Sequence, residues 1–219
     1  MKKSVKKNYV YNLIYQVFSI ITPLLTTPYI SRVLGSDGIG QYTFTNSIAS
    51  YFILLGSLGF AYYAQREIAR KQGDVYEQTK LFWEILISRF IMVMISACLY
   101  ILLLCLGLFD ETYTVLLWVL LINIIATAFD VVFLFQGNEE FGTILIRNIV
   151  IKCIGIALIF IFVRKKSDVW LYILCQSATL FLSNASLWFK LPKRLTKIHF
   201  RDLEIKGILL RQSNSLSQP

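Results

Sequence analysis

Histidine is almost absent from this chain of 219 residues and charge is scarce, since His199 is the single histidine and only 16% of the residues are charged. The sequence has no paired carboxylates for acid–base catalysis, no glycine-rich phosphate loop and no Ser/His arrangement. The adjacent Glu139 and Glu140 come nearest to a carboxylate pair, but neighbours on a loop are more often a solvated turn. We therefore expect no catalytic residues, and a membrane acyltransferase or glycosyltransferase has no residues in its support.

Cysteine is also sparse, and its placement argues against a metal site or a disulfide framework. The four cysteines lie inside apolar stretches, without the spacing of metal ligands: Cys98, Cys105, Cys153 and Cys175. The sequence also lacks a motif that would bind ATP. We expect no metal and no cofactor.

Long polar segments are missing from most of the chain, which instead contains six apolar runs. Each run is close to the roughly 20 residues that a helix needs to cross a bilayer. The predicted spans are Tyr9 to Ile30, Gln41 to Tyr62, Leu81 to Leu108, Tyr113 to Phe135, Thr143 to Val163 and Val169 to Phe189. A soluble helical bundle would need amphipathic stripes, whereas runs such as 101–106 and 154–163 are apolar all round. The sequence therefore predicts an all-α integral membrane protein with a bundle of six transmembrane helices.

The predicted domain organisation is simple. Residues 1–189 form one transmembrane lobe, because the links between the runs are short, and residues 190–219 form a basic cytoplasmic linker. The stretch from Gly207 to Leu210 suits the start of a seventh helix, but a polar stretch follows it. We expect a product that is truncated or frame-shifted after about Leu210.

The net charge of +9 is distributed as a topology signal rather than as a face that binds nucleic acid. Basic residues precede the first run, separate the second from the third and follow the sixth: Lys2, Lys3, Lys6, Lys7, Arg66, Arg70, Lys71, Lys80, Lys190, Lys193, Arg194, Lys197, Arg201 and Lys206. The positive-inside rule then predicts that both termini are cytoplasmic. Arg164, Lys165 and Lys166 oppose this orientation, because it places them outside.

Two local features bear on the helices themselves. Pro23 and Pro28 each remove a backbone donor, so the first helix should be kinked or unwound near its outer end. The stretch from Gln65 to Lys80 alternates charged with small and polar residues, which is typical of an amphipathic surface helix or of a solvated loop.

Ionisable residues inside the spans are the strongest functional signal, since each costs at least roughly 2.5 to 3.5 kcal/mol on insertion. Arg89, Asp130, Arg147 and Lys152 all fall in the cytoplasmic half of the predicted bundle. One interpretation is a polar latch, in which Asp130 pairs with Arg89 or Lys152. The other is a cationic, water-filled cavity that binds an anionic head group such as a phosphate, because three basic residues face one acid. If Arg147 instead extends its charged end toward the membrane surface, the surplus of basic residues in the cavity is smaller.

Uncharged polar residues extend the predicted lining of such a cavity. They are spread over five of the six spans: Gln16, Asn46, Asn123, Gln176 and Asn184. Hydrogen bonds between helices are the ordinary alternative for each of them.

Three stretches resemble the flippases that export O-antigen, capsule and teichoic-acid repeat units. These are Pro28-Tyr-Ile-Ser-Arg-Val-Leu-Gly-Ser-Asp-Gly-Ile-Gly-Gln-Tyr, the segment from Tyr51 to Ala69, and Phe133-Leu-Phe-Gln-Gly-Asn-Glu-Glu-Phe. The resemblance implies membership of the multidrug, oligosaccharidyl-lipid and polysaccharide exporter superfamily. Its members have two pseudo-symmetric bundles of six helices and work by alternating access. On this basis the chain corresponds to the N-terminal half.

The resemblance also implies a substrate and partners. A polyprenyl diphosphate-linked oligosaccharide would cross the cytoplasmic membrane while its tail stays in the lipid, with glycosyltransferases and a polymerase of a glycan-assembly pathway as further partners. Arg89, Lys152 and Arg147 would neutralise the diphosphate, Arg32 would receive it near the outer mouth, and Asp130 would couple to an ion. Energy would then come from an ion gradient.

Two other functions stay open at this point. A multidrug or small-solute antiporter of the same superfamily would need an acidic cavity, and Asp130 is the sole acid in the predicted interior of the spans. A non-transporting membrane subunit that scaffolds glycan-assembly enzymes would copurify with glycosyltransferases.

Overall fold

The computed structural model describes residues 5–57, 60–196, 198 and 203, and within these ranges the regular structure is entirely helical. Four segments of this part are long and apolar enough to cross a membrane: Tyr9–Arg70, Val75–Cys105, Glu111–Gly137 and Phe141–Phe162. The prediction of an all-α membrane protein is confirmed, whereas the count of six spans is not. Lys2, Lys3, His199 and the expected seventh helix lie outside the described residues.

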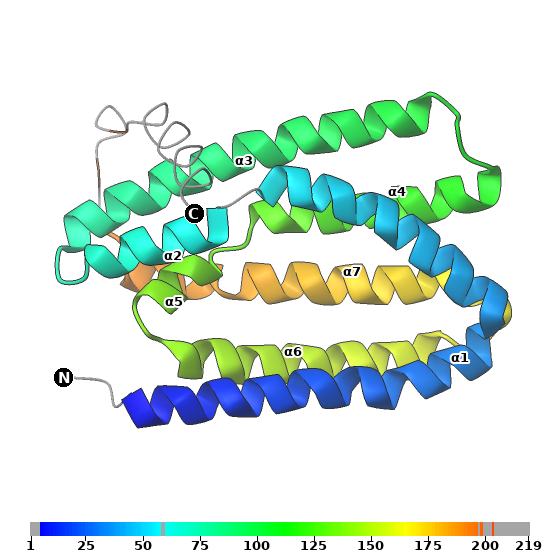
Figure 1. Cartoon of the computed structure of the whole chain (residues 1–219), viewed down its shortest axis with the longest axis horizontal. Helices are drawn as coiled ribbons and strands as arrows, with labels where there is room; N and C mark the ends of the chain where they lie inside the picture. Colours follow the sequence, from blue (N-terminus) through cyan, green and yellow to red (C-terminus); the bar gives the residue numbers. More distant parts are fainter. Residues whose placement is uncertain (1–4, 58–59, 197, 199–202, 204–219) are drawn as a thin grey trace, which may run out of the picture.

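Helix α1 (Val5–Ser57) merges the first two predicted spans. Its 53 residues form two arms, 5–34 and 36–57, which meet at Gly35 with φ 72° and ψ −177°. Figure 1 shows α1 running along the bundle, bending sharply and returning. The stretch between these two predicted spans, residues 31–40, is thus helical apart from Gly35. Pro23 and Pro28 stay within the first arm, and the bend falls at Gly35 because glycine adopts positive φ without steric cost.

Helices α2 (Phe60–Arg70) and α3 (Val75–Cys105) follow. A short turn separates them, and Asp74 begins α3 by accepting a hydrogen bond from the backbone N–H of Glu77 at 3.0 Å. The predicted surface helix over 65–80 is therefore half right. Its first part belongs to α2, which is a separate amphipathic helix, and its last part is the first turn and a half of α3.

The fourth predicted span is broken. Helix α4 (Glu111–Ala128) ends before Asp130, and the short α5 (Val132–Gly137) begins after it. Asp130 stabilises the break, since its Oδ1 accepts a hydrogen bond from the N–H of Val132 at 3.0 Å. Helix α6 (Phe141–Phe162), the short 3₁₀ helix η1 (Lys166–Asp168), α7 (Val169–Ser186) and η2 (Trp188–Lys193) complete the fold.

The core lies between the second arm of α1, α3, α4 and α7. Its fully buried side chains include Tyr100, Leu117, Leu120 and Ile124. The Tyr100 hydroxyl donates to the carbonyl of Leu117 at 2.8 Å, so this buried polar group is satisfied. A second apolar cluster around Phe82 joins α2 and α5 to the start of α3.

The two ends of the bundle differ. The starts of α1, α3 and α6 and the end of α7 lie at one end together with α2 and α5, which we call the α2 end (Figure 1). There Arg194 donates to the Oε2 of Glu140 at 2.7 Å and ties η2 to the start of α6. The α1 bend and the link between α6 and α7, with Arg164 to Lys166, lie at the opposite end.

Candidate functional site: a cationic cavity within the bundle

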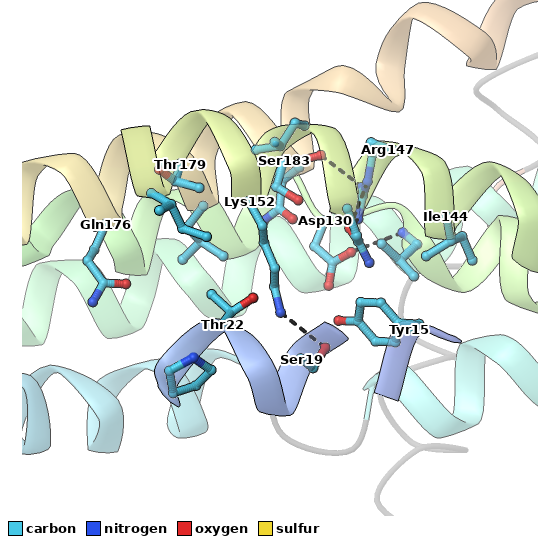
Figure 2. A pocket seen from close by; sticks show the side chains of 18 of the residues that line it. Tyr15, Ser19, Thr22, Asp130, Ile144, Arg147, Lys152, Gln176, Thr179 and Ser183 are labelled. Atoms are coloured by element: carbon cyan, nitrogen blue, oxygen red, sulfur yellow. Dashed lines mark hydrogen bonds between the residues drawn. The ribbon is translucent and has the colours of Figure 1, made fainter. Parts of the chain in front are cut away.

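A cavity of about 680 Å³ lies between the first arm of α1, α6, α7 and the α4–α5 break. Ligand sites in proteins typically measure roughly 300 to 1,000 Å³. Three cations and one carboxylate line it: Arg89, Arg147, Lys152 and Asp130. Figure 2 shows Lys152 reaching from α6 toward α1, with Arg147 and Asp130 on one side of it and Gln176 and Thr179 on the other.

Arg89 and Asp130 form an ion pair in the cavity wall. The Nη2 of Arg89 lies 3.2 Å from the Oδ2 of Asp130, and its Nη1 donates to the Asp130 carbonyl at 3.1 Å. Arg89 is 5% exposed, so its charge would be costly without this carboxylate. The pair joins α3 to the α4–α5 break and leaves little free charge on either side chain.

In the part of the chain that the structure describes, Lys152 and Arg147 form no ion pair, and their hydrogen bonds go to neutral groups. The Lys152 ammonium donates to the Ser19 hydroxyl at 3.1 Å and lies 5.4 Å from the centre of the Tyr15 ring. Arg147 donates from Nε to the Asn148 side-chain oxygen at 3.0 Å and from Nη1 to the Ser183 carbonyl at 2.8 Å. The three cations of the lining therefore share one carboxylate. Asp130 pairs with Arg89 and also attracts the Arg147 guanidinium, which leaves a surplus of two positive charges in the cavity.

The charged groups occupy one end of the cavity. We call Arg89, Asp130, Arg147 and Lys152 the cationic end, which is directed toward the α2 end of the bundle. The neutral end, on the other side of Lys152, comprises Thr22, Thr26, Gly155, Tyr172, Gln176 and Thr179. Arg147 and Gly155 are eight residues apart on α6, which corresponds to about 12 Å along the helix.

The structure thus brings together six of the residues that the sequence singled out: Arg89, Asp130, Arg147, Lys152, Gln176 and Asn184. Asn184 donates to the Ala126 carbonyl at 2.7 Å, so it also links α7 to α4. Gln176 donates to the Tyr172 hydroxyl at 2.6 Å.

The remaining four lie elsewhere. Arg32 and Gln16 are exposed on α1, outside the cavity lining. Gln16 misses the cavity because consecutive residues on a helix are turned by about 100°, and Tyr15 and Ser19 occupy the inner face instead. Asn46 lies on the second arm of α1, and Asn123 lies on α4, away from this cavity.

Several lining residues were not singled out from the sequence. Ser19, Thr22 and Thr26 follow one another at spacings of three and four on α1, and this periodicity marks one helix face. Tyr15, Asn148, Thr179 and Ser183 also line the cavity. Hydroxyl residues are common in membrane helices, so only the stripe on α1 carried a signal that could have been found.

The lining combines positive charge with hydrogen-bond donors and hydroxyls. Within residues 5–57 and 60–196, no three His, Cys, Asp or Glu side chains come together as a metal site would require. Guanidinium and ammonium groups bind phosphate oxygens well, and they do so more strongly where water is partly excluded.

Apolar spanning helices around an internal cavity with a surplus of positive charge define a multi-pass membrane protein. The chain belongs to the polysaccharide biosynthesis protein family, whose model matches residues 5–207.

Two curated relatives carry a provisional name as O-antigen transporters. The protein of Escherichia coli (strain K12) is 27% identical over 168 residues, which is 77% of this chain and 40% of the relative. The protein of Shigella dysenteriae is 25% identical over 181 residues, which is 81% of this chain and 44% of the relative. The chain thus spans about two fifths of the length of these relatives. No solved structure matches it.

Proposed function

We propose that this chain forms the substrate-binding bundle of a transporter that moves lipid-linked oligosaccharide repeat units across the cytoplasmic membrane. The observation that carries the proposal is the surplus of positive charge in the cavity, where Arg89, Arg147 and Lys152 share the single carboxylate of Asp130. A polyprenyl diphosphate is a strong anion, and its head group cannot enter hydrocarbon without compensation. Family membership and the names of the relatives point to the same class of substrate.

The residues that line the cavity have different roles. Lys152 and Arg147 neutralise the diphosphate, while Asp130 holds Arg89 in place and keeps that part of the wall neutral. The hydroxyl of Ser19 and the ring of Tyr15 position the Lys152 ammonium at the cavity surface. The tail of the substrate stays in the lipid, against an outer surface of α1 that exposes apolar side chains such as Ile20 and Leu24.

We propose six crossings with both termini on the cytoplasmic side. The two arms of α1, α3, α4, α6 and α7 supply them. We count α7, with its 18 residues, as a crossing although it is not one of the four segments that are long and apolar enough by themselves. The start of α1 and the end of α7 lie at the same end of the bundle, as an even number of crossings requires (Figure 1). The basic stretches near α2 and after α7 support the cytoplasmic assignment of that end.

Alternating access needs a second body that moves against this bundle. We propose that a second bundle, or a second copy of this chain, closes the cavity from the side of the first arm of α1. The relatives are more than twice as long as the stretch matched here, which leaves room in them for a second bundle.

A multidrug antiporter fits this cavity less well. Cationic drugs would meet Lys152 and Arg147 and find one carboxylate, Asp130, which is already paired with Arg89. A scaffolding subunit would not need an unpaired cationic cavity at all.

The test measures binding of farnesyl diphosphate to the purified chain in lipid nanodiscs, with farnesol as the uncharged comparison. We expect farnesyl diphosphate to bind and Lys152→Met and Arg147→Gln each to weaken it about tenfold or more, the loss that a charge-assisted contact predicts. Arg164→Gln is the matched control, because Arg164 is an exposed cation in the link at the other end of the bundle. If Lys152→Met binds the diphosphate as well as the original chain does, the proposal is wrong.

A further inference from the structure

The neutral end of the cavity is rich in hydrogen-bond acceptors, in contrast to the donors of the cationic end. Thr22, Thr26 and Thr179 each use the hydroxyl proton on a carbonyl of their own helix, at 2.8, 3.1 and 2.6 Å. A hydroxyl has one proton and two lone pairs, so each of these oxygens can still accept. Gln176 likewise uses its amide N–H on Tyr172, which leaves its carbonyl oxygen as an acceptor.

These acceptors converge from two helices onto one space. Thr22 and Thr26 belong to α1, whereas Gln176 and Thr179 belong to α7, and all four line the same cavity. Gly155 of α6 makes this convergence sterically allowed, because a Cβ at that position would lie 2.6 Å from the Thr179 hydroxyl oxygen. If these hydroxyl groups served only to bond the carbonyls of their own helices, they would not need to line the same cavity.

We infer that the neutral end is a subsite for an uncharged sugar, whose hydroxyl groups donate to Thr22, Thr26, Gln176 and Thr179 while the diphosphate lies at the cationic end. This inference rests on the proposed function. Each sugar hydroxyl has one proton that must find an acceptor where water is scarce, and an acceptor-rich wall supplies such partners. All the charged groups of the lining belong to the cationic end, so an acidic sugar would bring a carboxylate to a place without a compensating charge.

The position of Gln176 is held by a specific contact. Its amide nitrogen lies 2.6 Å from the Tyr172 hydroxyl, and Tyr172 is itself 9% exposed and packed edge-on against Tyr42. Tyr172 therefore acts as a positioning residue that aims the Gln176 carbonyl oxygen at the sugar.

Three probes separate the subsite from the diphosphate site. They are farnesyl diphosphate, farnesyl diphosphate linked to glucose, and farnesyl diphosphate linked to glucuronic acid, each titrated into the full chain in lipid nanodiscs. We expect glucose to raise the affinity over the bare diphosphate and glucuronic acid to raise it less or to lower it. The glucose-to-bare affinity ratio is the readout for the variants.

Gln176→Leu and Thr26→Val should each lower that ratio about fivefold, as the loss of one neutral hydrogen bond predicts. Thr26→Ser restores the oxygen and should restore the ratio, which a general packing defect would not allow. Thr45→Val is the matched control, since Thr45 also donates to a carbonyl four residues back, at 2.8 Å, but lies on the second arm of α1 outside the cavity.

The outcomes are distinct. If farnesyl diphosphate binds and glucose adds nothing, or if glucuronic acid adds as much as glucose, the neutral-sugar subsite is wrong while the proposed function stands. If none of the probes binds, the proposed function fails and the subsite fails with it. A ratio that falls equally in Thr45→Val would assign the effect to helix packing and overturn the inference.

Discussion

On the side of the bundle built from α3, α4 and the second arm of α1, side chains fill the interior, and Tyr100, Leu117, Leu120 and Ile124 are completely buried. On the side built from α6 and the first arm of α1, the same thickness of protein encloses a cavity lined by cations and hydroxyls. Helix α7 lies between them, with Ile173 in the core and Gln176 in the cavity.

Overall hydrophobicity does not distinguish the two sides, since α4 and α6 both meet the requirement for a membrane span. The difference comes from a few positions. Arg147, Asn148 and Lys152 interrupt the apolar sequence of α6. In α4, beyond the first turn, Asn123 is the one residue with an amide or charged side chain. The packed core and the polar cavity thus differ by a handful of polar side chains on one face of α6.

The largest difference between the packed side and the cavity side is expected when a carboxylate is introduced on each. Leu120→Asp buries a carboxylate in the packed core without a partner and should cost more than about 3 kcal/mol, so little folded protein should be recovered. Ser19→Asp places the same group in the cavity beside the Lys152 ammonium and should leave the yield of folded protein close to normal. Size-exclusion profiles in detergent report both. Equal losses for the two variants would show that the cavity side is as dry as the core.

A smaller effect is expected at the ion pair of the cavity wall. Asp130→Asn keeps the oxygen that accepts from Val132 but removes the charge opposite the buried Arg89, and we expect a loss of about 2 kcal/mol, since Asp130 is partly exposed. Arg89→Gln together with Asp130→Asn should recover part of it. Thermal unfolding of the single and double variants gives the coupling energy, and a coupling near zero would mean that the pair is not formed.

The smallest effect concerns the link between α6 and α7, outside the spans. The backbone N–H of Arg164, followed by that of Lys165, donates to the Asp168 carboxylate and holds its pKa below the ordinary value for an aspartate. A depressed pKa stabilises the fold above that value, and the contribution is lost as pH falls through the folded-state pKa. Asp168→Asn should therefore lower the unfolding temperature slightly at pH 7, and the difference should shrink as the pH falls through the folded-state pKa of Asp168. Ser167→Ala is the control. A loss that persists at acid pH would contradict this assignment.

The sequence predicted the membrane class and the charged part of the site for one physical reason. Charges are so costly inside a bilayer that Arg89, Asp130 and Lys152 had to mark a special environment. Arg32 could not be placed, because a single helix does not reveal which of its faces meets its neighbours, and α1 shows no apolar stripe that would fix its rotation.

The bend of α1 and the neutral end of the cavity were beyond the sequence for different reasons. Proline is the commonest marker of a kink, yet Pro23 and Pro28 fit within the first arm, and Gly35 makes the turn beside Lys166 of η1. Thr26 and Thr179 are unremarkable as isolated hydroxyls. Their meaning depends on the approach of α6 to α7 at Gly155, which only the packed structure provides.

The most direct test is whether water enters the cavity and whether the cavity attracts anions. In a cysteine-free background, Ile156→Cys places a thiol in the cavity lining and Leu117→Cys places one in the packed core. We predict that an anionic methanethiosulfonate modifies position 156 faster than a cationic one does, that Lys152→Met removes this preference, and that position 117 does not react. Equal and slow modification at the two positions would contradict a water-filled cationic cavity.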